Sequence, residues 1–291
     1  MINDKLCFGT ANFAKEYGIN KRKGYNHKKI KTIFNLLKRN KIKHIDTAIN
    51  YKNVEKKIGK FNLDSFKIYT KIPKTPKKIK NINLWIRNQI KLSLKKTKKI
   101  FFEGVFLHNP EDLLKNKKNQ IYDSLINLKK EKKIKKIGLS IYDLNMLKKI
   151  TKEFKIDMIQ IPYNLFDRGE KKKELLDKLK KEKIEIHVRS IFLQGILLMD
   201  SNKLPTHFKK WKNKFINFEN WCKKNKISKI QACLNAVLED RVFNKVLIST
   251  ENEEQLVQIF DALNKKIKKD YPKDLQTNEK KLIDPRLWKR N

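Results

Sequence analysis

A chain of 291 residues that is 39% apolar can bury the core of one large domain or of two ordinary ones, which excludes a disordered protein. No stretch approaches the roughly 18 apolar residues of a membrane helix, and the first residues lack a signal peptide's apolar segment, so we expect a cytoplasmic protein without a membrane partner. The 71 basic residues exceed the 31 acidic ones by 40, but nearly all are lysines spread along the chain, so no specific nucleic-acid partner is expected.

Short apolar runs alternate with amphipathic stretches along the chain. Several of the runs are rich in Ile, Val or Phe, which favours buried strands. The runs cover residues 6–8, 42–46, 66–71, 102–108, 137–140, 158–162, 184–190 and 246–249.

The stretches between the runs show the spacing of helices with one apolar face. That spacing, near 3.6 residues, lets the apolar face pack on a sheet. The positions are Ile30, Ile33, Phe34 and Leu37; Leu84, Ile86, Ile90 and Leu94; Ile121, Leu125 and Leu128; Leu175, Leu176 and Leu179; and Leu256, Ile259, Phe260 and Leu263.

Repeated strand-then-helix units predict an α/β fold. Eight such units fit a (β/α)8 TIM barrel, which typically needs about 250 residues, as a single domain over residues 1–291. A doubly wound sheet is the alternative, but the eight glycines never approach the GxGxxG spacing of a dinucleotide-binding loop.

Longer connections occur at residues 109–118, 198–212 and 268–291, and none of them has the features of a domain boundary. The first two follow the fourth and seventh runs, on the face where a barrel builds its site. The C-terminal tail, 268–291, carries Leu287 and Trp288 and has two equal interpretations, a lid that folds back or a poorly ordered terminus.

The cysteines are too few to form a framework. Cys7, Cys222 and Cys233 are odd in number and show no CxxC spacing. They predict neither a disulfide network nor a zinc site, and we expect buried thiols.

Four polar side chains stand at or just beyond the ends of the second, third and fourth runs. They are Asp46, Tyr51, Lys71 and His108. Each alone has an ordinary explanation, because a lysine reaches for water, a carboxylate caps a helix, and a tyrosine or histidine fills a core or ends a strand. On consecutive strands of a barrel, however, all four would meet at the carboxyl-terminal mouth.

Motifs along nearly the whole chain resemble those of the aldo-keto reductases. The matching segments are Leu6-Cys7-Phe8-Gly9-Thr10, Asp46-Thr47-Ala48-Ile49-Asn50-Tyr51 with Glu55 and Gly59, Thr70-Lys71, Phe106-Leu107-His108-Asn109-Pro110, Ile137-Gly138-Leu139-Ser140, Ile159-Gln160-Ile161-Pro162-Tyr163-Asn164, Arg189-Ser190-Ile191-Phe192-Leu193-Gln194-Gly195 and Glu254-Gln255-Leu256.

The resemblance implies the family's (β/α)8 fold, an NAD(P)H cofactor and no metal. It also implies that the family's Asp-Tyr-Lys-His tetrad falls on Asp46, Tyr51, Lys71 and His108. The cofactor contacts that it implies are Gly9, Thr10, Asp46, Ser140, Gln160, Arg189, Ser249, Thr250, Glu251 and Gln255.

Carbonyl reduction gives these four residues a chemical rationale. It needs a hydride at carbon and a proton at oxygen, and a free tyrosine with a pKa of about 10 is a sluggish acid at neutral pH. A cation about 4 Å away would lower that pKa by roughly three units if water is excluded. We therefore expect Lys71 to lower the pKa of Tyr51 and Asp46 to hold Lys71 charged. His108 would donate a hydrogen bond to the carbonyl oxygen.

Two positions depart from the pattern that the resemblance implies. Ile141 follows Ser140 where many members carry an asparagine that holds the nicotinamide carboxamide, so Ser140 and Gln160 would share that task. Arg189 stands where well-known members place an aromatic ring against the nicotinamide, and a guanidinium plane can stack there too.

The stretch 246–256 predicts which cofactor is used. It holds none of the 71 basic residues, and Ser249 and Gln255 stand where NADPH-selective members carry Lys or Arg. Its glutamates suit a helix's first turn, and Glu251 would also accept a hydrogen bond from a ribose 2′-hydroxyl. We expect NADH to be used as well as NADPH or better, unless a lysine of a neighbouring loop reaches the 2′-phosphate.

The expected function is the reduction of a small aldehyde or ketone, in either direction, by a monomeric or weakly associating enzyme. Phe208, Trp211 and Trp288 are expected to face a substrate that the sequence does not identify. One alternative is a nucleotide-binding barrel that acts as a sensor or partner subunit without turnover. A basic RNA-binding protein is the other, and no recognised motif supports it.

Overall fold

Parallel strands form the centre of the molecule. The computed structural model describes residues 2–14, 24–263 and 270–288. Strands β1 to β8 lie in chain order in one closed barrel, in which β8 pairs with β1. The strands are β1 (Leu6–Gly9), β2 (His44–Asp46), β3 (Lys67–Ile72), β4 (Gly104–Leu107), β5 (Ile137–Ser140), β6 (Met158–Pro162), β7 (Glu185–Arg189) and β8 (Lys245–Ile248). The predicted (β/α)8 fold is confirmed.

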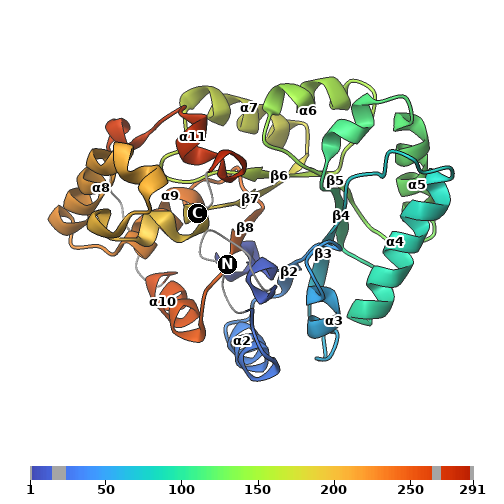
Figure 1. Cartoon of the computed structure of the whole chain (residues 1–291), viewed down its shortest axis with the longest axis horizontal. Coiled ribbons are helices and arrows are strands. Elements are labelled where there is room, and N and C mark those ends of the chain that lie inside the picture. The colour runs from blue at the N-terminus through green and yellow to red at the C-terminus, as the bar shows by residue number, and fades with distance from the viewer. Residues whose placement is uncertain (1, 15–23, 264–269, 289–291) are drawn as a thin grey trace.

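Helices surround the barrel and cover its outer face (Figure 1). The α-helices are α1 (Ile2–Lys5), α2 (His27–Arg39), α3 (Val54–Ile58), α4 (Ile82–Thr97), α5 (Lys118–Lys130), α6 (Leu144–Thr151), α7 (Glu170–Lys181), α8 (Lys212–Lys224), α9 (Lys229–Leu238), α10 (Glu253–Leu263) and α11 (Lys280–Ile283). Short 3-10 helices lie in the connections: η1 (Ala11–Phe13), η2 (Pro110–Leu114), η3 (Leu193–Leu198), η4 (Ser201–Lys203), η5 (Thr206–Trp211), η6 (Lys273–Leu275) and η7 (Pro285–Leu287).

All eight predicted apolar runs contain a strand, and their ends differ from it by no more than two residues. The second run shows why the ends move. Its first residue, Ile42, donates its backbone N–H to Leu37 O at 2.9 Å, so it closes the turn after α2 instead of joining the sheet. β2 therefore starts only at His44.

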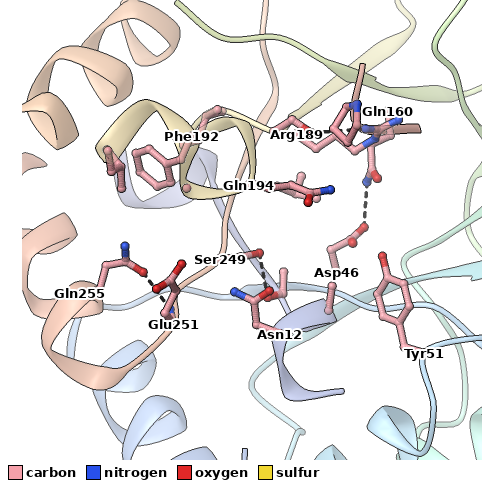
Figure 2. A pocket seen from close by; sticks show the side chains of 18 of the residues that line it. Asn12, Asp46, Tyr51, Gln160, Arg189, Phe192, Gln194, Ser249, Glu251 and Gln255 are labelled. Carbon is pink, nitrogen blue, oxygen red and sulfur yellow. Dashed lines mark hydrogen bonds between the residues drawn. The ribbon is translucent and has the colours of Figure 1, made fainter. Parts of the chain in front are cut away.

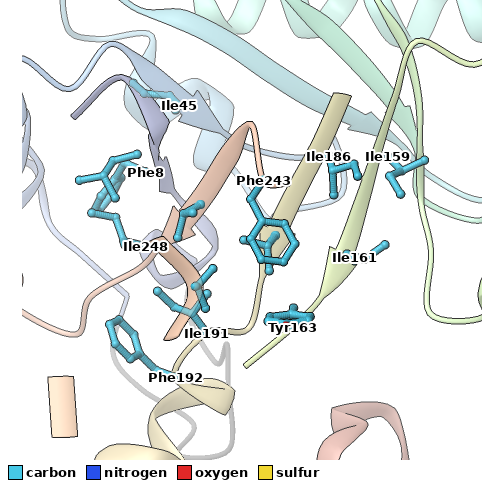
Figure 3. Packing of buried hydrophobic residues seen from close by; sticks show 14 of the residues in the cluster. Phe8, Ile45, Ile159, Ile161, Tyr163, Ile186, Ile191, Phe192, Phe243 and Ile248 are labelled. Atoms are coloured by element: carbon cyan, nitrogen blue, oxygen red, sulfur yellow. The ribbon is translucent and has the colours of Figure 1, made fainter. Parts of the chain in front are cut away.

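Side chains alternate between the two faces of the barrel wall. Outward apolar side chains such as Phe8, Ile45 and Ile248 belong to the large core between strands and helices (Figure 3). A separate buried cluster holds Cys7, Tyr69, Phe106, Met158 and Leu247, which alternate with the outward set. A packed interior leaves only the mouth of the barrel for a binding site.

Two glycines make room for this inner cluster. A Cβ on Gly104 would lie 2.2 Å from Met158 Cε, and one on Gly138 would lie 2.6 Å from Met158 Cγ and from Phe106 Cδ1. No real Cβ makes such contacts. The barrel interior is thus filled by large side chains from neighbouring strands.

One predicted helical face is wrong in part. Leu84 was assigned to the buried face of its helix, but its side chain is 55% exposed. The buried face of α4 begins instead at Ile82 and continues through Ile86 and Ile90. Leu84 is two residues from both Ile82 and Ile86, which at 3.6 residues per turn places it on the other side of the helix.

The three long connections carry short helical turns. η2 lies in the first, η4 and η5 in the second, and η6, α11 and η7 in the tail. Residues 268–269 and 289–291 of the predicted tail lie outside the described residues. Cys7, Cys222 and Cys233 are free and buried, as predicted. Within the described ranges no helix has the length and hydrophobicity needed to cross a bilayer.

Candidate active site

The four residues predicted to be catalytic gather at the carboxyl-terminal mouth of the barrel. Asp46 ends β2, Lys71 lies near the end of β3, and His108 directly follows β4. Tyr51 lies in the loop between β2 and α3. Asp46 and Tyr51 line an open cavity at this mouth, while Lys71 is buried beside Asp46.

A buried ion pair is the centre of the site. Asp46 Oδ1 accepts from Lys71 Nζ, and both side chains are almost fully buried. Gln160 Nε2 donates to Asp46 Oδ2 at 2.8 Å, and Lys71 Nζ donates to Thr47 O at 2.9 Å. Both charges therefore have further hydrogen-bond partners, which a buried pair requires if it is not to be strongly destabilising.

The backbone of Asp46 is fixed from β1. Thr10 donates to Asp46 O through its N–H at 2.9 Å and through its Oγ1 at 3.0 Å. Thr10 is fully buried and does not line the cavity as the structure describes it. Thr10, predicted to contact the cofactor, thus holds the backbone of Asp46 in this structure.

Tyr51 lies between the ion pair and His108. Its ring centroid is 5.6 Å from Lys71 Nζ and 6.5 Å from the His108 ring, which meets it edge-on at 81°. Burial raises the pKa of Tyr51, and the nearby Asp46 carboxylate raises it further. The net shift of the Tyr51 pKa is therefore upward in this structure, opposite to the expected lowering, because burial disfavours the phenolate.

His108 has the opposite shift. Burial, the charge of Lys71 and the charge of Arg189 together lower the pKa of His108 to about 4. The imidazole is therefore neutral at neutral pH. A neutral imidazole still has one N–H to donate, so His108 can support an oxygen that gains negative charge without itself losing a proton.

Gln160 contacts the ion pair and also lines the cavity. Its side chain is fully buried, and its Oε1 has no hydrogen-bond partner among the described residues. Ser140 pairs with Gln160 across β5 and β6 and is buried, but it is not part of the cavity wall. The unpaired oxygen of Gln160 points to a missing donor, which a carboxamide would supply.

Gly9 and Ser249 form the floor of the cavity beside Asn12. Ser249 Oγ donates to Gly9 O at 3.1 Å, and a Cβ on Gly9 would lie only 2.5 Å from that hydroxyl. Thr250 is buried behind them, where its carbonyl accepts from Asn12 Nδ2 at 2.6 Å. Close approach of a ligand to the backbone here depends on the missing Cβ of Gly9.

Glu251 and Gln255 form the far end of the cavity, away from Tyr51 (Figure 2). Gln255 Oε1 accepts from the backbone N–H of Glu251 at 2.8 Å. The exposed Lys29, near the start of α2, lines the same cavity, although sequence reasoning did not single it out. Tyr25, one turn earlier, donates its hydroxyl to Thr250 O at 3.0 Å and holds this segment against the loop after β8.

The loop after β7 covers one side of the cavity. Ser190, Leu193 and Gln194 have positive φ angles of 61°, 48° and 53°, and Gly195 follows at 91°. A Cβ on Gly195 would lie 3.2 Å from Glu251 Oε1, so the loops after β7 and β8 meet here. Non-glycine residues in the left-handed region cost roughly 1–3 kcal/mol each and persist only where the surroundings hold them.

Arg189, at the end of β7, lines the cavity beside the start of this loop. Its guanidinium carbon lies 4.1 Å above the centroid of the Tyr142 ring. Arg286, from the tail, lies 3.6 Å from the same centroid, so the ring has a guanidinium within contact distance from each of two distant segments. Neither Tyr142 nor Arg286 was identified from the sequence.

The C-terminal tail reaches the site, as the lid interpretation expected of residues 268–291. Pro285 lines the cavity, and Asp284 forms an ion pair with Arg286 at 2.6 Å. Trp288 is buried, with its ring 4.9 Å from Phe208 in an edge-on contact. Within the described residues the tail is therefore packed against the barrel mouth.

The aromatic residues expected to face the substrate do not do so. Phe208, Trp211 and Trp288 are buried, and none of them lines the cavity in the part of the chain that is described. They pack against each other where η5 meets the tail. That expectation is wrong because the rings, which come from two long connections, are more stable packed against one another than exposed to water at the cavity.

Several cavity residues were not predicted as site residues, although Phe192 and Gln194 lie in a segment that resembles the family's motifs. Asn12, Tyr25, Lys29, Tyr142, Phe192, Gln194, Leu198 and Pro285 all contribute to the wall. Tyr142 also had a usable signal, because it comes two residues after a predicted strand end. Across residues 2–14, 24–263 and 270–288, no three His, Cys, Asp or Glu side chains are placed to bind a metal ion.

Known proteins show similarity at two levels. The sequence model of the Aldo/keto reductase family matches residues 5–278. No curated protein matches the sequence. Two structures of proteins assigned to the aldo-keto reductases from Pseudomonas aeruginosa are each 19% identical, cover 89% of this chain and 88% and 90% of their own, and have TM-scores of 0.65 and 0.64. An aldo-keto reductase from Bacillus halodurans in its holo form is 17% identical, with coverage of 99% and 93% and a TM-score of 0.70.

Proposed function

The chain belongs to the aldo/keto reductase family, and from this we propose that it reduces an aldehyde or ketone to an alcohol with NAD(P)H, using Tyr51 as the proton donor. The observation that carries the proposal is the buried Asp46–Lys71 pair, with Gln160 on one side and Tyr51 and His108 on the other. A charged pair is costly to bury, so its presence at a cavity supports a catalytic role.

Tyr51 and His108 would act on the carbonyl oxygen. Because burial raises the pKa of Tyr51, the phenol stays protonated at neutral pH and is ready to donate. Its proton would move only as negative charge develops on the substrate oxygen, which is a much stronger base than a phenolate. Neutral His108 would donate a hydrogen bond to the same oxygen and favour that charge.

Lys71 and Asp46 would stabilise the site after proton transfer. Loss of the proton leaves a phenolate on Tyr51, and the Lys71 ammonium lies 5.6 Å from the centroid of its ring. Asp46 holds that ammonium in place. In a site with little water, the attraction between a cation and a phenolate is several times stronger than in bulk solvent.

Residues of the cavity wall fit a nicotinamide dinucleotide, which supplies the hydride when bound. Gln160 Oε1, buried and without a partner among the described residues, would accept from the carboxamide N–H. Gly9 leaves room for close approach at the floor, beside Ser249. The long cavity, from Tyr51 at one end to Gln255 at the other, suits an extended ligand.

The far end of the cavity supports use of NADH at least as well as NADPH. Glu251 and Gln255 are cavity residues there, and Glu251 would accept from a ribose 2′-hydroxyl. Lys29 also lines the cavity and follows Tyr25 by four residues. Its side chain is exposed, however, and exposed charges interact weakly. Lys29 is therefore the cation to remove in a test of cofactor selectivity.

The test is a fluorescence titration with NADH and NADPH, followed by a screen of carbonyl substrates. Binding of both cofactors and turnover of at least one carbonyl are expected. A preference for NADPH of about a hundredfold, which is about 2.7 kcal/mol, would contradict the cofactor proposal. If Lys29→Gln abolished such a preference, Lys29 would be its source. Cofactor binding without turnover of any carbonyl would contradict the reductase proposal.

A further inference from the structure

The Arg189 guanidinium is a partly buried cation without an acidic partner. It lines the cavity, and its one hydrogen bond is a long one, 3.4 Å from Nη1 to Ser190 Oγ. Among residues 2–14, 24–263 and 270–288, no carboxylate forms an ion pair with it. The Asp284 carboxylate is close enough for the charge of Arg189 to help lower its pKa, but Asp284 is paired with Arg286 at 2.6 Å. A guanidinium carries five N–H donors, so most of its hydrogen-bonding capacity is unused.

Other partly buried cations among the described residues have closer hydrogen-bond partners, either carboxylates or backbone carbonyls. Lys172 pairs with Asp167 at 2.6 Å, and Lys229 pairs with Glu219 at 2.7 Å. Arg168 has no acidic partner but donates to the carbonyls of Leu165 and Pro272, at 3.0 and 3.3 Å. Burying an unmatched charge is costly, so the exception at Arg189 points to an anion that comes from outside the chain.

The unmatched cation lies at the reaction end of the cavity. Figure 2 shows Arg189 beside Gln160, away from Glu251 and Gln255. It ends β7, across the barrel mouth from Tyr51, which follows β2. Its charge acts on both acid–base groups, because it lowers the pKa of His108 and opposes the rise in the pKa of Tyr51.

Tyr142 holds Arg189 in this position. The ring centroid lies 4.1 Å from the guanidinium carbon, which is within cation–π distance, and Arg189 has only one long hydrogen bond, to Ser190 Oγ. Arg286 contacts the same ring at 3.6 Å but is paired with Asp284. A planar guanidinium that is held by stacking is pre-organised to bind a carboxylate or phosphate through two parallel hydrogen bonds.

We propose that Arg189 binds an anionic group of the substrate, so that the preferred substrates are carbonyl compounds bearing a carboxylate or a phosphate. This proposal rests on the proposed reductase function. The carbonyl would lie at Tyr51 and His108, and the anion would lie across the mouth on the Arg189 edge. Cofactor phosphates are less suitable partners, because Arg189 lies beside the carboxamide site at Gln160.

The experiment compares matched charged and neutral substrates. One pair is succinic semialdehyde and its methyl ester, and the other is glyceraldehyde phosphate and glyceraldehyde. For each pair the quantity is the ratio of kcat/KM for the anion to kcat/KM for the neutral compound, because effects on the cofactor cancel in that ratio. Assays run at about 0.15 M salt, where long-range attraction by the basic surface is screened.

The wild-type ratio is expected to be at least about tenfold in one pair, equal to about 1.4 kcal/mol. Arg189→Gln should reduce that ratio to near one. Arg286→Gln is the matched control, because it removes the same charge beside the same ring but from a cation already paired with Asp284. Its ratio should stay within about threefold of the wild type. Which pair responds distinguishes a carboxylate from a phosphate.

Wild-type ratios near one in both pairs would overturn the proposal while leaving the reductase function intact. An equal loss in Arg286→Gln would also overturn it, because the effect would then be a general field. If no carbonyl turns over, the reductase function fails. Calorimetric titration of the protein with succinate then decides the anion site, since binding must be weakened at least about tenfold by Arg189→Gln and not by Arg286→Gln.

Discussion

Asp46→Asn should destabilise the protein strongly, because it leaves the Lys71 ammonium buried without its counter-charge. Lys71 is 2% exposed, and among the described residues its remaining hydrogen-bond acceptor is Thr47 O at 2.9 Å. The new amide must also face two donors, Lys71 Nζ and Gln160 Nε2, with a single oxygen. Breaking a buried pair by removing one partner typically costs about 3–5 kcal/mol, and we expect a loss in that range.

Lys71→Met provides the control for this mechanism. Methionine is apolar and close in volume to lysine, so Asp46→Asn with Lys71→Met removes both charges and should recover at least about 2 kcal/mol over Asp46→Asn alone. Urea denaturation followed by circular dichroism at pH 7 measures all four proteins of the cycle. The reasoning is refuted if Asp46→Asn lies within about 1 kcal/mol of the wild type, or if the second substitution brings no recovery.

Two further properties follow from charge and burial. Burial and the nearby Lys245 and Lys67 lower the pKa of His44 to about 3. In the unfolded chain the His44 imidazole binds a proton as the pH falls through about 6.5, whereas in the folded protein it stays neutral. The free energy of unfolding therefore falls as the pH drops. Between pH 7 and pH 4.5, the free energy of unfolding of His44→Phe should fall by about 2.5 kcal/mol less than that of the wild type; equal losses in the two proteins would contradict the buried neutral ring. The net charge of +40 predicts weak, sequence-independent nucleic-acid binding that is lost by about 0.2 M salt in a gel-shift titration, and sequence preference at that salt would revive an RNA-binding function.

The barrel was predictable because each strand has a local sequence pattern. Short runs of Ile, Val and Phe, each followed by a helical pattern, specify both the strands and their order. Where the prediction failed, at Leu84, spacing alone did not show which side of the helix meets the sheet. The buried stripe starts at Ile82, and its position is set by contacts with the sheet that the sequence does not display.

The site was predictable where its residues end strands or lie in segments that resemble the family's motifs, as Tyr51 and Gln255 do. Asp46, Lys71 and His108 follow that rule, and the barrel brings them together. Tyr142 and Arg286 come from different segments and meet at Arg189 through the path of the tail, which no local pattern encodes. Likewise, the raised pKa of Tyr51 depends on burial and on the nearby Asp46 carboxylate, which only the folded arrangement brings about.

Tyr51→Phe tests the central claim most directly. The substitution removes the hydroxyl and keeps the ring, so the cofactor dissociation constant should stay within about threefold of the wild type. Turnover of a carbonyl substrate should fall at least about a hundredfold, because a general acid contributes in the transition state. Both quantities are measured on the same preparation. Turnover within about threefold of the wild type, with cofactor binding intact, would contradict the assignment of Tyr51 as the proton donor.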